Sequence, residues 1–506
     1  MSSPSSTAGL LALGRVEPRS LVVEDGAEFA FARAGTEGRL AILAPADDPG
    51  LSAFNGEASE HDGRTLLLCP CSPENAAALR ARLPWLRPQP LGLRTSAGMG
   101  DRLGLATPGH VRAVRAAGGD LAPIFAQQSI REMARTGRSP QEVVDDAMWG
   151  AFAEGWREPC GADADHLKTT DDVDACVAAG YTFYTIDPGE HVDNAAETAA
   201  PAELRAMLDA LPWSDLEDSA SDLLRRYAGQ SHDLEGHTIG LDEGQVAKAA
   251  VKYGRAVAHV KGMYRHLMAA TGGEGCELEV SVDETERVTS HAEHLYIAGE
   301  LQRLGVRWVS LAPRYVGDFE KGADYIGDVA AFEADFAVHA AIARRFGPYK
   351  LSLHSGSDKF SVYEPAARQT RGLVHLKTAG TSYLEALRTV AALDPAFFRE
   401  IYVFARERFE TDRASYHVSG RLDRAPEPDA LGDAELPGLL EQFDARQILH
   451  VTFGSVLRHA TDDGRRPFYD HLMALLREHP EAYAANVERH FLRHLRPFAQ
   501  VLSAES

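Results

Sequence analysis

The sequence predicts an α/β protein whose core is a TIM-barrel-like (β/α)8 barrel, with a small N-terminal α+β cap and a helical C-terminal tail. Two observations favour this fold. From about residue 93 to 423, short β-rich runs alternate with longer amphipathic stretches, which is typical of consecutive βα units. Several of the short runs are almost entirely apolar, as expected of parallel strands that are covered on both faces.

The clearest strand candidates are residues 181–187, 276–284, 307–313, 349–356 and 372–378. Helices are expected between them, at 291–305, 328–347 and 382–393. An open doubly wound sheet is the alternative, but such a sheet usually carries a glycine-rich nucleotide-binding turn after its first strand. The nearest segment, GMGDRLG at 98–104, follows no clear strand and lacks the Gly-x-Gly-x-x-Gly spacing. We therefore expect a closed barrel and no dinucleotide site.

Differences in composition and in the pattern of apolar residues along the chain predict three domains. Residues 1–92 combine short apolar runs, Gly, Asp and Pro punctuation and one helical stretch, and form the N-terminal α+β cap. Residues 93–423 form the catalytic barrel. Residues 424–506 open with a proline- and acid-rich connector and continue as amphipathic helices. These helices are expected to serve either as a lid on the barrel or as a subunit contact, so a homo-oligomer is one option.

The composition favours a small-molecule ligand. The chain has 506 residues and a formal charge of −22, from 52 Lys and Arg against 74 Asp and Glu. Nucleic-acid binding relies on clustered basic residues, which this acidic sequence lacks, so no nucleic-acid partner is expected. No stretch approaches the roughly 20 apolar residues of a membrane span, so no membrane partner is expected either. Five cysteines argue against a disulfide framework, and the default location is cytoplasmic.

The reactive groups of a parallel α/β barrel stand at the carboxyl ends of its strands, so polar residues that end an apolar run are candidates for the site. Four segments meet this condition: GADADHLKT (161–169), SVDETERVTS (281–290), LSLHSGSDKF (351–360) and LVHLKTAGTS (373–382). Together they would bring acids, imidazoles and cations to one end of the barrel.

Three histidines in these segments are candidate metal ligands: His166, His354 and His375. An imidazole near the end of an apolar run is expected to be buried, so hydrogen bonds or a divalent cation must satisfy its nitrogen atoms. For any one of them, a hydrogen-bonded structural role is the more common. Three together make a three-histidine site, open to water or substrate, an equal alternative. Zinc, manganese, nickel or iron would suit that donor set.

Asp165 and Glu284 are the candidate acid–base pair. Asp165 directly precedes His166, and Glu284 closes the strongest strand candidate, so both can face a substrate at the barrel mouth. Asp283 and Glu284 should point to opposite faces if the strand continues, so one of the two enters the site. Glu286 is a weaker candidate, because it can form a rim salt bridge with its neighbour.

The candidate substrate-binding cations are Lys168, Arg287, Lys359 and Lys377. They would make the pocket locally positive in an acidic protein, which favours an anionic substrate through charge-assisted hydrogen bonds. Each one alone is more commonly solvated. The tetrapeptide His-Leu-Lys-Thr occurs at 166–169 and again at 375–378, and strand periodicity should place each His and its Lys on one face.

Seven segments spread over nearly the whole chain resemble the tagaturonate/fructuronate epimerase family of bacterial hexuronate catabolism. They are GMGDRLGLATPGH (98–110), GADADHLKT (161–169), TIDPGEHV (185–192), SVDETE (281–286), LHSGSDKFSVY (353–363), HLKTAGTSYLEALR (375–388) and LHVTFGSVL (449–457). The resemblance implies a metal-dependent, TIM-barrel-like isomerase that interconverts D-tagaturonate and D-fructuronate. It suggests Asp165 as proton acceptor, Glu284 as proton donor, and the three histidines as ligands of a divalent metal cation.

Family members that act on fructose and tagatose leave open whether the substrate is a keto-sugar acid or a neutral keto-sugar. The two hexuronates differ at C4, which is β to the C2 ketone, so proton abstraction beside the carbonyl would invert C3 instead. We therefore expect retro-aldol cleavage of C3–C4, rotation of the aldehyde and re-addition to its other face. Transient oxidation by a nicotinamide is the rival route. The alternative functions are a non-catalytic sugar-acid-binding protein and a metal-dependent sugar aldolase or isomerase.

Overall fold

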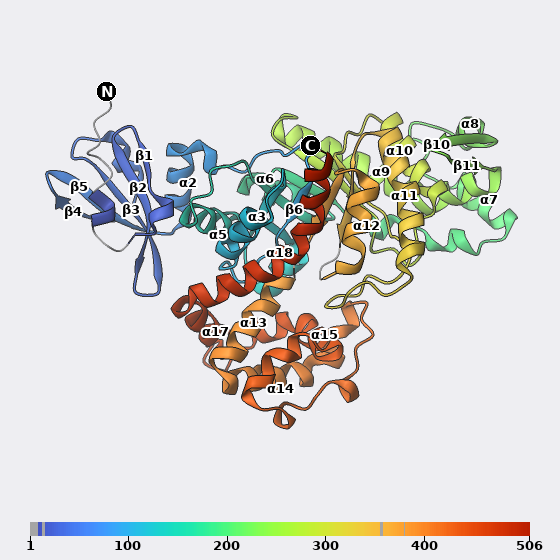
Figure 1. Ribbon diagram of the computed structural model, residues 1–506. Coiled ribbons are helices and arrows are strands. Elements are labelled where there is room, and N and C mark those ends of the chain that lie inside the picture. The colour runs from blue at the N-terminus through green and yellow to red at the C-terminus, as the bar shows by residue number, and fades with distance from the viewer. Residues whose placement is uncertain (1–8, 13–15, 355–357, 379, 506) are drawn as a thin grey trace.

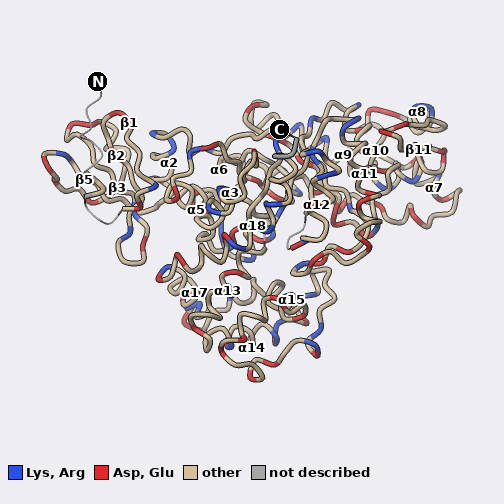
Figure 2. Tube along the Cα trace, in the orientation of Figure 1, with Lys and Arg blue, Asp and Glu red and all other residues tan. Residues whose placement is uncertain are grey.

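The computed structural model describes residues 9–12, 16–354, 358–378 and 380–505. A small antiparallel sheet at the N-terminus, a central barrel surrounded by helices and a helical C-terminal part lie next to one another (Figure 1). Acidic and basic residues alternate along the chain trace in all three parts (Figure 2). None of the helices within the described ranges is long and apolar enough to cross a membrane.

Eight parallel strands close the barrel in the order β12-β13-β14-β15-β6-β7-β8-β9, which confirms the predicted fold class. The strands are buried along nearly their whole length because helices cover them from outside and side chains fill the interior. The strands are β6 (Ser96–Gly98), β7 (Ala122–Ser129), β8 (Gly161–Leu167), β9 (Phe183–Ile186), β12 (Glu277–Ser281), β13 (Ser310–Ala312), β14 (Lys350–His354) and β15 (Val374–Lys377).

All five strand candidates contain barrel strands, namely β9, β12, β13, β14 and β15. Residues 355–357 of the segment 351–360 lie outside the described residues, and the first two of them form the end of the fourth candidate. Residue 379 also lies outside the described residues. The sequence pattern did not mark β6, β7 and β8. β6 has three residues, and β8 alternates small and acidic residues in GADADHL, so neither reads as an apolar run.

The N-terminal sheet is antiparallel, with strand order β1-β2-β3-β5-β4. One of its faces packs Phe29 and Ile42 against Trp149 and Phe152 of α5 (Pro140–Ala153), which joins the sheet to the barrel. Its strands are β1 (Val22–Glu24), β2 (Ala27–Ala34), β3 (Glu37–Pro45), β4 (Glu57–His61) and β5 (Arg64–Pro70), and the helices α1 (Gly9–Ala12) and α2 (Pro73–Arg82) accompany it.

Polar caps start the barrel helices close behind the strands. Ser129 ends β7 and accepts a hydrogen bond from the Glu132 amide, which begins α4 within one residue of the strand and places Arg131 at the barrel mouth. The helices around the barrel are α3 (Thr107–Ala117), α4 (Ile130–Thr136), α5, α6 (Thr170–Ala179), α7 (Pro201–Asp209), α8 (Ala220–Tyr227), α9 (Glu243–Thr271), α10 (His291–Arg303), α11 (Val329–Phe346) and α12 (Phe360–Thr370), with a hairpin of β10 (Gln230–Leu234) and β11 (His237–Leu241).

The last strand, β15, leads into the helical C-terminal part. Its final helix, α18, packs on α3, α12 and α13, so the chain end returns to the barrel (Figure 1). The domain boundaries at residues 92 and 423 stay predictions. The helices of this part are α13 (Thr381–Leu393), α14 (Pro395–Asp412), α15 (Phe443–Val451), α16 (Phe453–Arg458), α17 (Pro467–Glu478) and α18 (Pro480–Glu505).

Candidate active site

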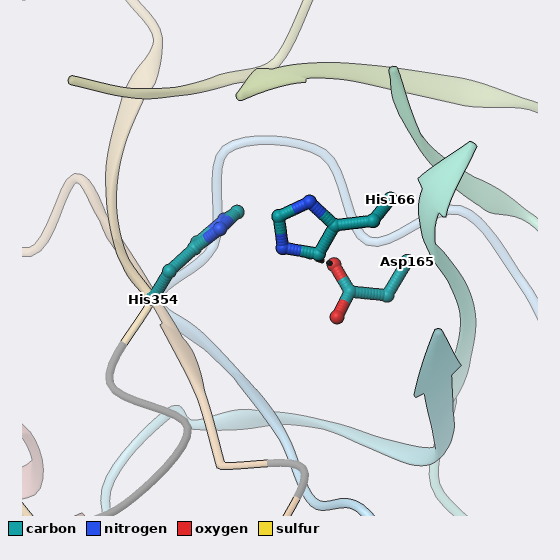
Figure 3. Close-up of side chains that lie close together, drawn as sticks. All are labelled: Asp165, His166 and His354. Atoms are coloured by element: carbon teal, nitrogen blue, oxygen red, sulfur yellow. Dashed lines mark ion pairs between the residues drawn. The ribbon is translucent and has the colours of Figure 1, made fainter. Parts of the chain in front are cut away.

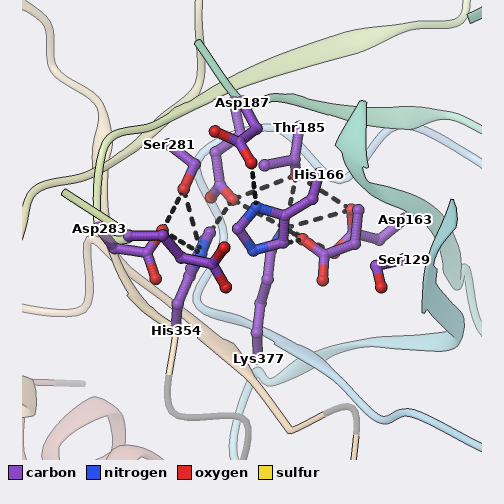
Figure 4. Close-up of polar contacts among 12 residues, drawn as sticks. Ser129, Asp163, His166, Thr185, Asp187, Ser281, Asp283, His354 and Lys377 are labelled. Atoms are coloured by element: carbon purple, nitrogen blue, oxygen red, sulfur yellow. Dashed lines mark hydrogen bonds and ion pairs between the residues drawn. The ribbon is translucent and has the colours of Figure 1, made fainter. Parts of the chain in front are cut away.

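Polar side chains from several barrel strands converge at the carboxyl ends of the strands (Figure 4). A cavity of about 240 Å³ opens there and is lined by Asp283, Glu284, His354, Arg131 and Lys321, among others. His354, Arg131 and Lys321 also line an adjoining hollow. Asp165, His166 and Lys377 line this second hollow as well. In a parallel α/β barrel this end is where reactive groups stand.

Lys377, the last residue of β15, occupies the centre of this group. Its Nζ lies 2.7 Å from Asp165 Oδ1, 3.1 Å from Asp163 Oδ2 and 2.8 Å from Glu279 Oε1, and its side chain is 3% exposed. Burial alone would raise the pKa of Asp165, but the charges of Lys377 and the nearby imidazoles outweigh it and hold that pKa below its ordinary value. One ammonium thus faces three buried carboxylates, which leaves an excess of negative charge.

His166 faces the same space because β8 is irregular there. Its φ of 53° lies in the left-handed region, and the pairing of β8 with β9 shifts register between Ala164 and Leu167. In a regular strand, Asp165 and His166 would point to opposite faces. The left-handed residue lets both enter the site, with His166 Nε2 3.8 Å from Asp165 Oδ1 (Figure 3). On its other side, His166 Nδ1 lies 3.1 Å from Asp187 Oδ2, just after β9.

His354, the last residue of β14, completes a group with Asp165 and His166 whose ligand atoms all lie within 4.8 Å of one another. The centroids of the His166 and His354 rings are 5.3 Å apart, and both rings are drawn in Figure 3. His354 Nε2 lies 2.8 Å from Glu279 Oε1, and its Nδ1 lies 3.2 Å from Asp283 Oδ1. Burial would lower the pKa of both imidazoles, but the surrounding carboxylates raise it to about 10 for His166 and about 9 for His354. Protons therefore balance the carboxylates when no other cation is present.

His375 lies apart from these two imidazoles. The register pairs Lys377 with His354, whereas His375 pairs with Ser352 and Ser96, two residues earlier along the strands. It is therefore about 6–7 Å deeper in the barrel. There its Nδ1 lies 2.8 Å from the Ser96 hydroxyl and burial lowers its pKa. The structure thus brings two of the three candidate metal ligands together, and the third contacts the barrel interior instead.

Glu284 and Asp283 both line the cavity, in contrast to the expectation that one of the two would enter. The reason is that β12 ends at Ser281, so strand alternation does not extend to these residues. Glu284 pairs with both terminal nitrogen atoms of Arg131, at 3.0 and 3.3 Å. Burial would raise the pKa of Glu284, but His166, Lys321 and Arg131 lower it to about 2.

Of the four candidate cations, Lys377 alone lies among the described residues that line the two hollows. Lys168 is half exposed and pairs with Glu190 at 2.8 Å. Arg287 is exposed. Lys359 is buried and its Nζ donates to the carbonyl oxygen atoms of Glu320 and Ala323. The cations that do line the cavity are Arg131, Arg314 and Lys321.

Sequence reasoning missed three of the carboxylates that surround the imidazoles, Asp163, Asp187 and Glu279, and it placed Asp283 behind Glu284. Asp163 and Glu279 lie inside β8 and β12, before the strand ends at which candidate residues were sought. The alternation of acidic residues with small or aliphatic ones in these two strands is the sequence feature that could have identified them. Arg131 carried a weaker signal. It follows the segment QQSI, in which a strand ends and a capped helix begins.

The fold and the site together define a (β/α)8-barrel enzyme with a charged polar centre at the carboxyl ends of its strands. Comparison with known proteins gives the family. The tagaturonate epimerase family matches residues 18–498, and the chain belongs to it. The chain is therefore an isomerase, as the sequence predicted.

Individual relatives cover nearly the whole chain. A tagaturonate/fructuronate epimerase from Thermotoga maritima is 43% identical over 466 residues, which span 91% of this chain and 92% of the relative. The crystal structure of a fructuronate-tagaturonate epimerase from Cohnella laeviribosi with one glycerol matches with a TM-score of 0.90 and 39% identity, over 97% of this chain and 98% of that chain. The native structure of the same enzyme matches with the same TM-score and identity over 96% and 97%.

The substitution Lys377→Met tests the central ion cluster. It leaves three carboxylates without their shared ammonium, so we expect a loss of about 3–5 kcal/mol in the free energy of unfolding, measured by urea denaturation at pH 8. Lys350→Met is the matched control, because Lys350 is also buried in the barrel but donates to the Ser96 hydroxyl, and burial lowers its pKa to about 8. Equal losses for the two variants would contradict the account.

Proposed function

We propose that this chain interconverts D-tagaturonate and D-fructuronate by inverting C4, and that it does so by retro-aldol and aldol steps with the help of a divalent cation. The observation that carries the proposal is the position of two acids, Asp165 and Glu284, beside the same imidazole, His166, in a cavity that also holds Arg131. Family membership supports the substrate pair, and the site supplies groups for proton transfer and for binding an acid.

Arg131 and Lys321 are suited to bind the C6 carboxylate. Both line the cavity, and Arg131 already holds a carboxylate, that of Glu284, through two nitrogen atoms. A guanidinium binds a carboxylate well in this two-point geometry. The four candidate cations named from the sequence do not share this position, since Lys377 is engaged with Asp165 and the others lie away from the cavity.

Asp165 is suited to accept the proton of the C4 hydroxyl. Lys377 keeps its carboxylate ionised, and Gln127 Nε2 holds its second oxygen at 3.1 Å. When the proton leaves O4, the C3–C4 electron pair passes to C3 and the C2 ketone, which yields a three-carbon enediolate and a three-carbon aldehyde with the carboxylate. Rotation of the aldehyde and re-formation of the C3–C4 bond on its other face invert C4.

Glu284 is suited to return a proton to O4 after the rotation. Its pKa of about 2 in the free protein depends in part on Arg131. His166 and Lys321 lower this pKa more than Arg131 does. If Lys321 and Arg131 both turn to the substrate carboxylate, Glu284 loses two of these three cations and its pKa rises, which favours the protonated form that donates to O4. Proton exchange with water then restores both acids.

His166 and His354 fit a divalent cation. Each is anchored through one ring nitrogen to a carboxylate, Asp187 for His166 and Glu279 for His354, as metal-bound histidines usually are. The second nitrogen of the His354 ring lies 3.2 Å from Asp283 Oδ1, a carboxylate that could share the cation. One ligand atom from each imidazole and one from Asp165 lie within 4.8 Å of one another. A cation bound there would stabilise negative charge on the oxygen atoms at C2 and C3 as a Lewis acid.

Product analysis tests the proposed function. Purified protein with an added divalent cation is incubated with D-tagaturonate and followed by ¹³C NMR, and we expect an equilibrium mixture with D-fructuronate. Tight binding of tagaturonate without product would support a binding protein instead. Three-carbon fragments as the main product would support an aldolase.

Metal affinity should rise with pH. The metal-free imidazoles are protonated up to a pKa of about 9 for His354 and about 10 for His166, so a cation must displace these protons below that range. Affinity for Co²⁺ should therefore increase by roughly tenfold per pH unit for each proton displaced, from pH 7 towards pH 9. Isothermal titration calorimetry at several pH values measures this slope. An affinity that does not change over this range would exclude His166 and His354 as the ligands.

The variant Arg131→Gln tests recognition of the carboxylate. We expect kcat/KM for D-tagaturonate to fall by about 10- to 100-fold, because a charge-assisted bond to a carboxylate contributes about 1.5–3 kcal/mol. Turnover of neutral D-tagatose, if present, should change much less. Lys168→Gln is the control, since Lys168 pairs with Glu190 away from the cavity. Equal losses on the acid and the neutral sugar would assign Arg131 to another role.

A further inference from the structure

A second group of histidines lies outside the barrel, between α10 and α11. His291 and His294 begin α10, whereas Asp335 and His339 lie four residues apart on α11 and therefore share one face of that helix. The two helices lie side by side (Figure 1). None of these four residues takes part in the site at the barrel mouth.

Three of these side chains meet around one point. His291 Nε2 lies 2.9 Å from Asp335 Oδ1, and His339 Nε2 lies 3.6 Å from Asp335 Oδ2. The ligand atoms of all three residues lie within 4.8 Å of one another. A metal ion with bonds of about 2.0–2.2 Å holds its ligand atoms at such separations.

Two atoms of this group are buried without a hydrogen-bond partner in the described part of the chain: His339 Nε2 and Asp335 Oδ2. They face each other at 3.6 Å, which is too long for a hydrogen bond. A buried polar atom without a partner is costly, so a pair of them calls for a proton or a cation between them. Burial and the neighbouring His294 lower the pKa of His339, which disfavours a proton and a positive charge on its ring.

A second layer fixes the His339 ring from behind. His339 Nδ1 lies 2.8 Å from His294 Nδ1, and His294 Nε2 lies 2.7 Å from the Tyr349 hydroxyl. With its proton on Nδ1, His339 donates to His294 and presents the lone pair of Nε2 to Asp335. Metal-bound histidines are commonly held through their second nitrogen in this way.

Local charge distinguishes this group from the other buried His–Asp cluster, that of Asp358, His490 and His494. In that cluster Arg446 Nη2 lies 2.7 Å from Asp358, so a cation is already present. Around His339, the charged or titratable groups that shift its pKa are His294, Asp335 and His291, with no Lys or Arg among them. Within the described residues, the ion-pair partners of Asp335 are His291 and His339, which carry a positive charge only when protonated.

We propose that His291, Asp335 and His339 form a second site for a divalent cation of the zinc class, which ties α10 to α11. Two imidazoles and one carboxylate suit Zn²⁺ or Co²⁺ and leave a position for water. The His291 side chain is 30% exposed and the Asp335 side chain 19%, so the ion can enter from solvent. His339 also packs on the Tyr315 ring, which lines the cavity at the barrel mouth, so the bound ion would stiffen that wall.

Titration with Co²⁺ alone tests the proposal, with binding followed by calorimetry and by visible absorption, in which tetrahedral Co²⁺ is intense. The parent for this test is the double variant His166→Gln/His354→Gln of the full chain, which removes the imidazoles at the barrel mouth. We expect this parent to bind one Co²⁺ per chain and to gain thermal stability from it. The result does not depend on catalysis, so it is separate from the proposed function.

Adding Asp335→Asn to the parent should abolish this binding and the thermal shift. His291→Gln, at a more exposed position, should weaken Co²⁺ binding at least tenfold. This variant tests the proposal if the Asp335→Asn variant fails to fold. The control is His266→Gln, which removes a half-buried histidine paired with Asp174 at 2.7 Å, away from α10 and α11, and should change nothing. A parent that binds no Co²⁺, or an Asp335→Asn or His291→Gln variant that binds it as the parent does, would overturn the proposal.

Discussion

The contact between the Lys377 ammonium and the carboxylates of Asp163, Asp165 and Glu279 is the interaction on which the rest of the site depends. Three buried carboxylates carry more charge than one ammonium can balance, and burying unbalanced charge is costly. The remaining charge is met by the two imidazoles next to it, which explains why the pKa values of His166 and His354 rise despite burial. A divalent cation would meet the same need without the two protons.

The barrel provides the geometry for this charge balance. Lys377 and His354 end adjacent parallel strands and pair with each other in register, so they reach the mouth at one level. β8 contributes two consecutive residues, Asp165 and His166, because the chain turns left-handed at His166. A non-glycine residue in this region is uncommon, and such conformations persist where the surrounding structure holds them in place. Here the contact with Asp187 holds the imidazole in that position.

The sequence predicted barrel strands well where aliphatic residues alternate with the polar ones, and poorly in β8, where small and acidic residues alternate. The aliphatic residues of β12, β14 and β15 identified them as strands. In β8, Asp163 and Asp165 occupy inward-facing positions, so the sequence shows no apolar run there. The repeated His-Leu-Lys-Thr predicted equivalent faces for its two copies. In β15 both His375 and Lys377 are buried, but β8 turns left-handed at His166 and ends at Leu167, so Lys168 reaches solvent. Strand register and backbone conformation decide which of the two tetrapeptides places its imidazole at the barrel mouth. Neither property can be predicted from the tetrapeptide sequence itself.

The protonation state of His166 and His354 in the metal-free protein tests the charge balance most directly. ¹⁵N NMR of histidine-labelled protein, assigned with His166→Gln and His354→Gln, distinguishes a doubly protonated ring from a neutral one at pH 8. The account predicts that both rings are doubly protonated at this pH and that one equivalent of Zn²⁺ per site removes a ring proton from each. Two neutral rings at pH 8, titrating near the ordinary histidine pKa of about 6.5, would contradict it.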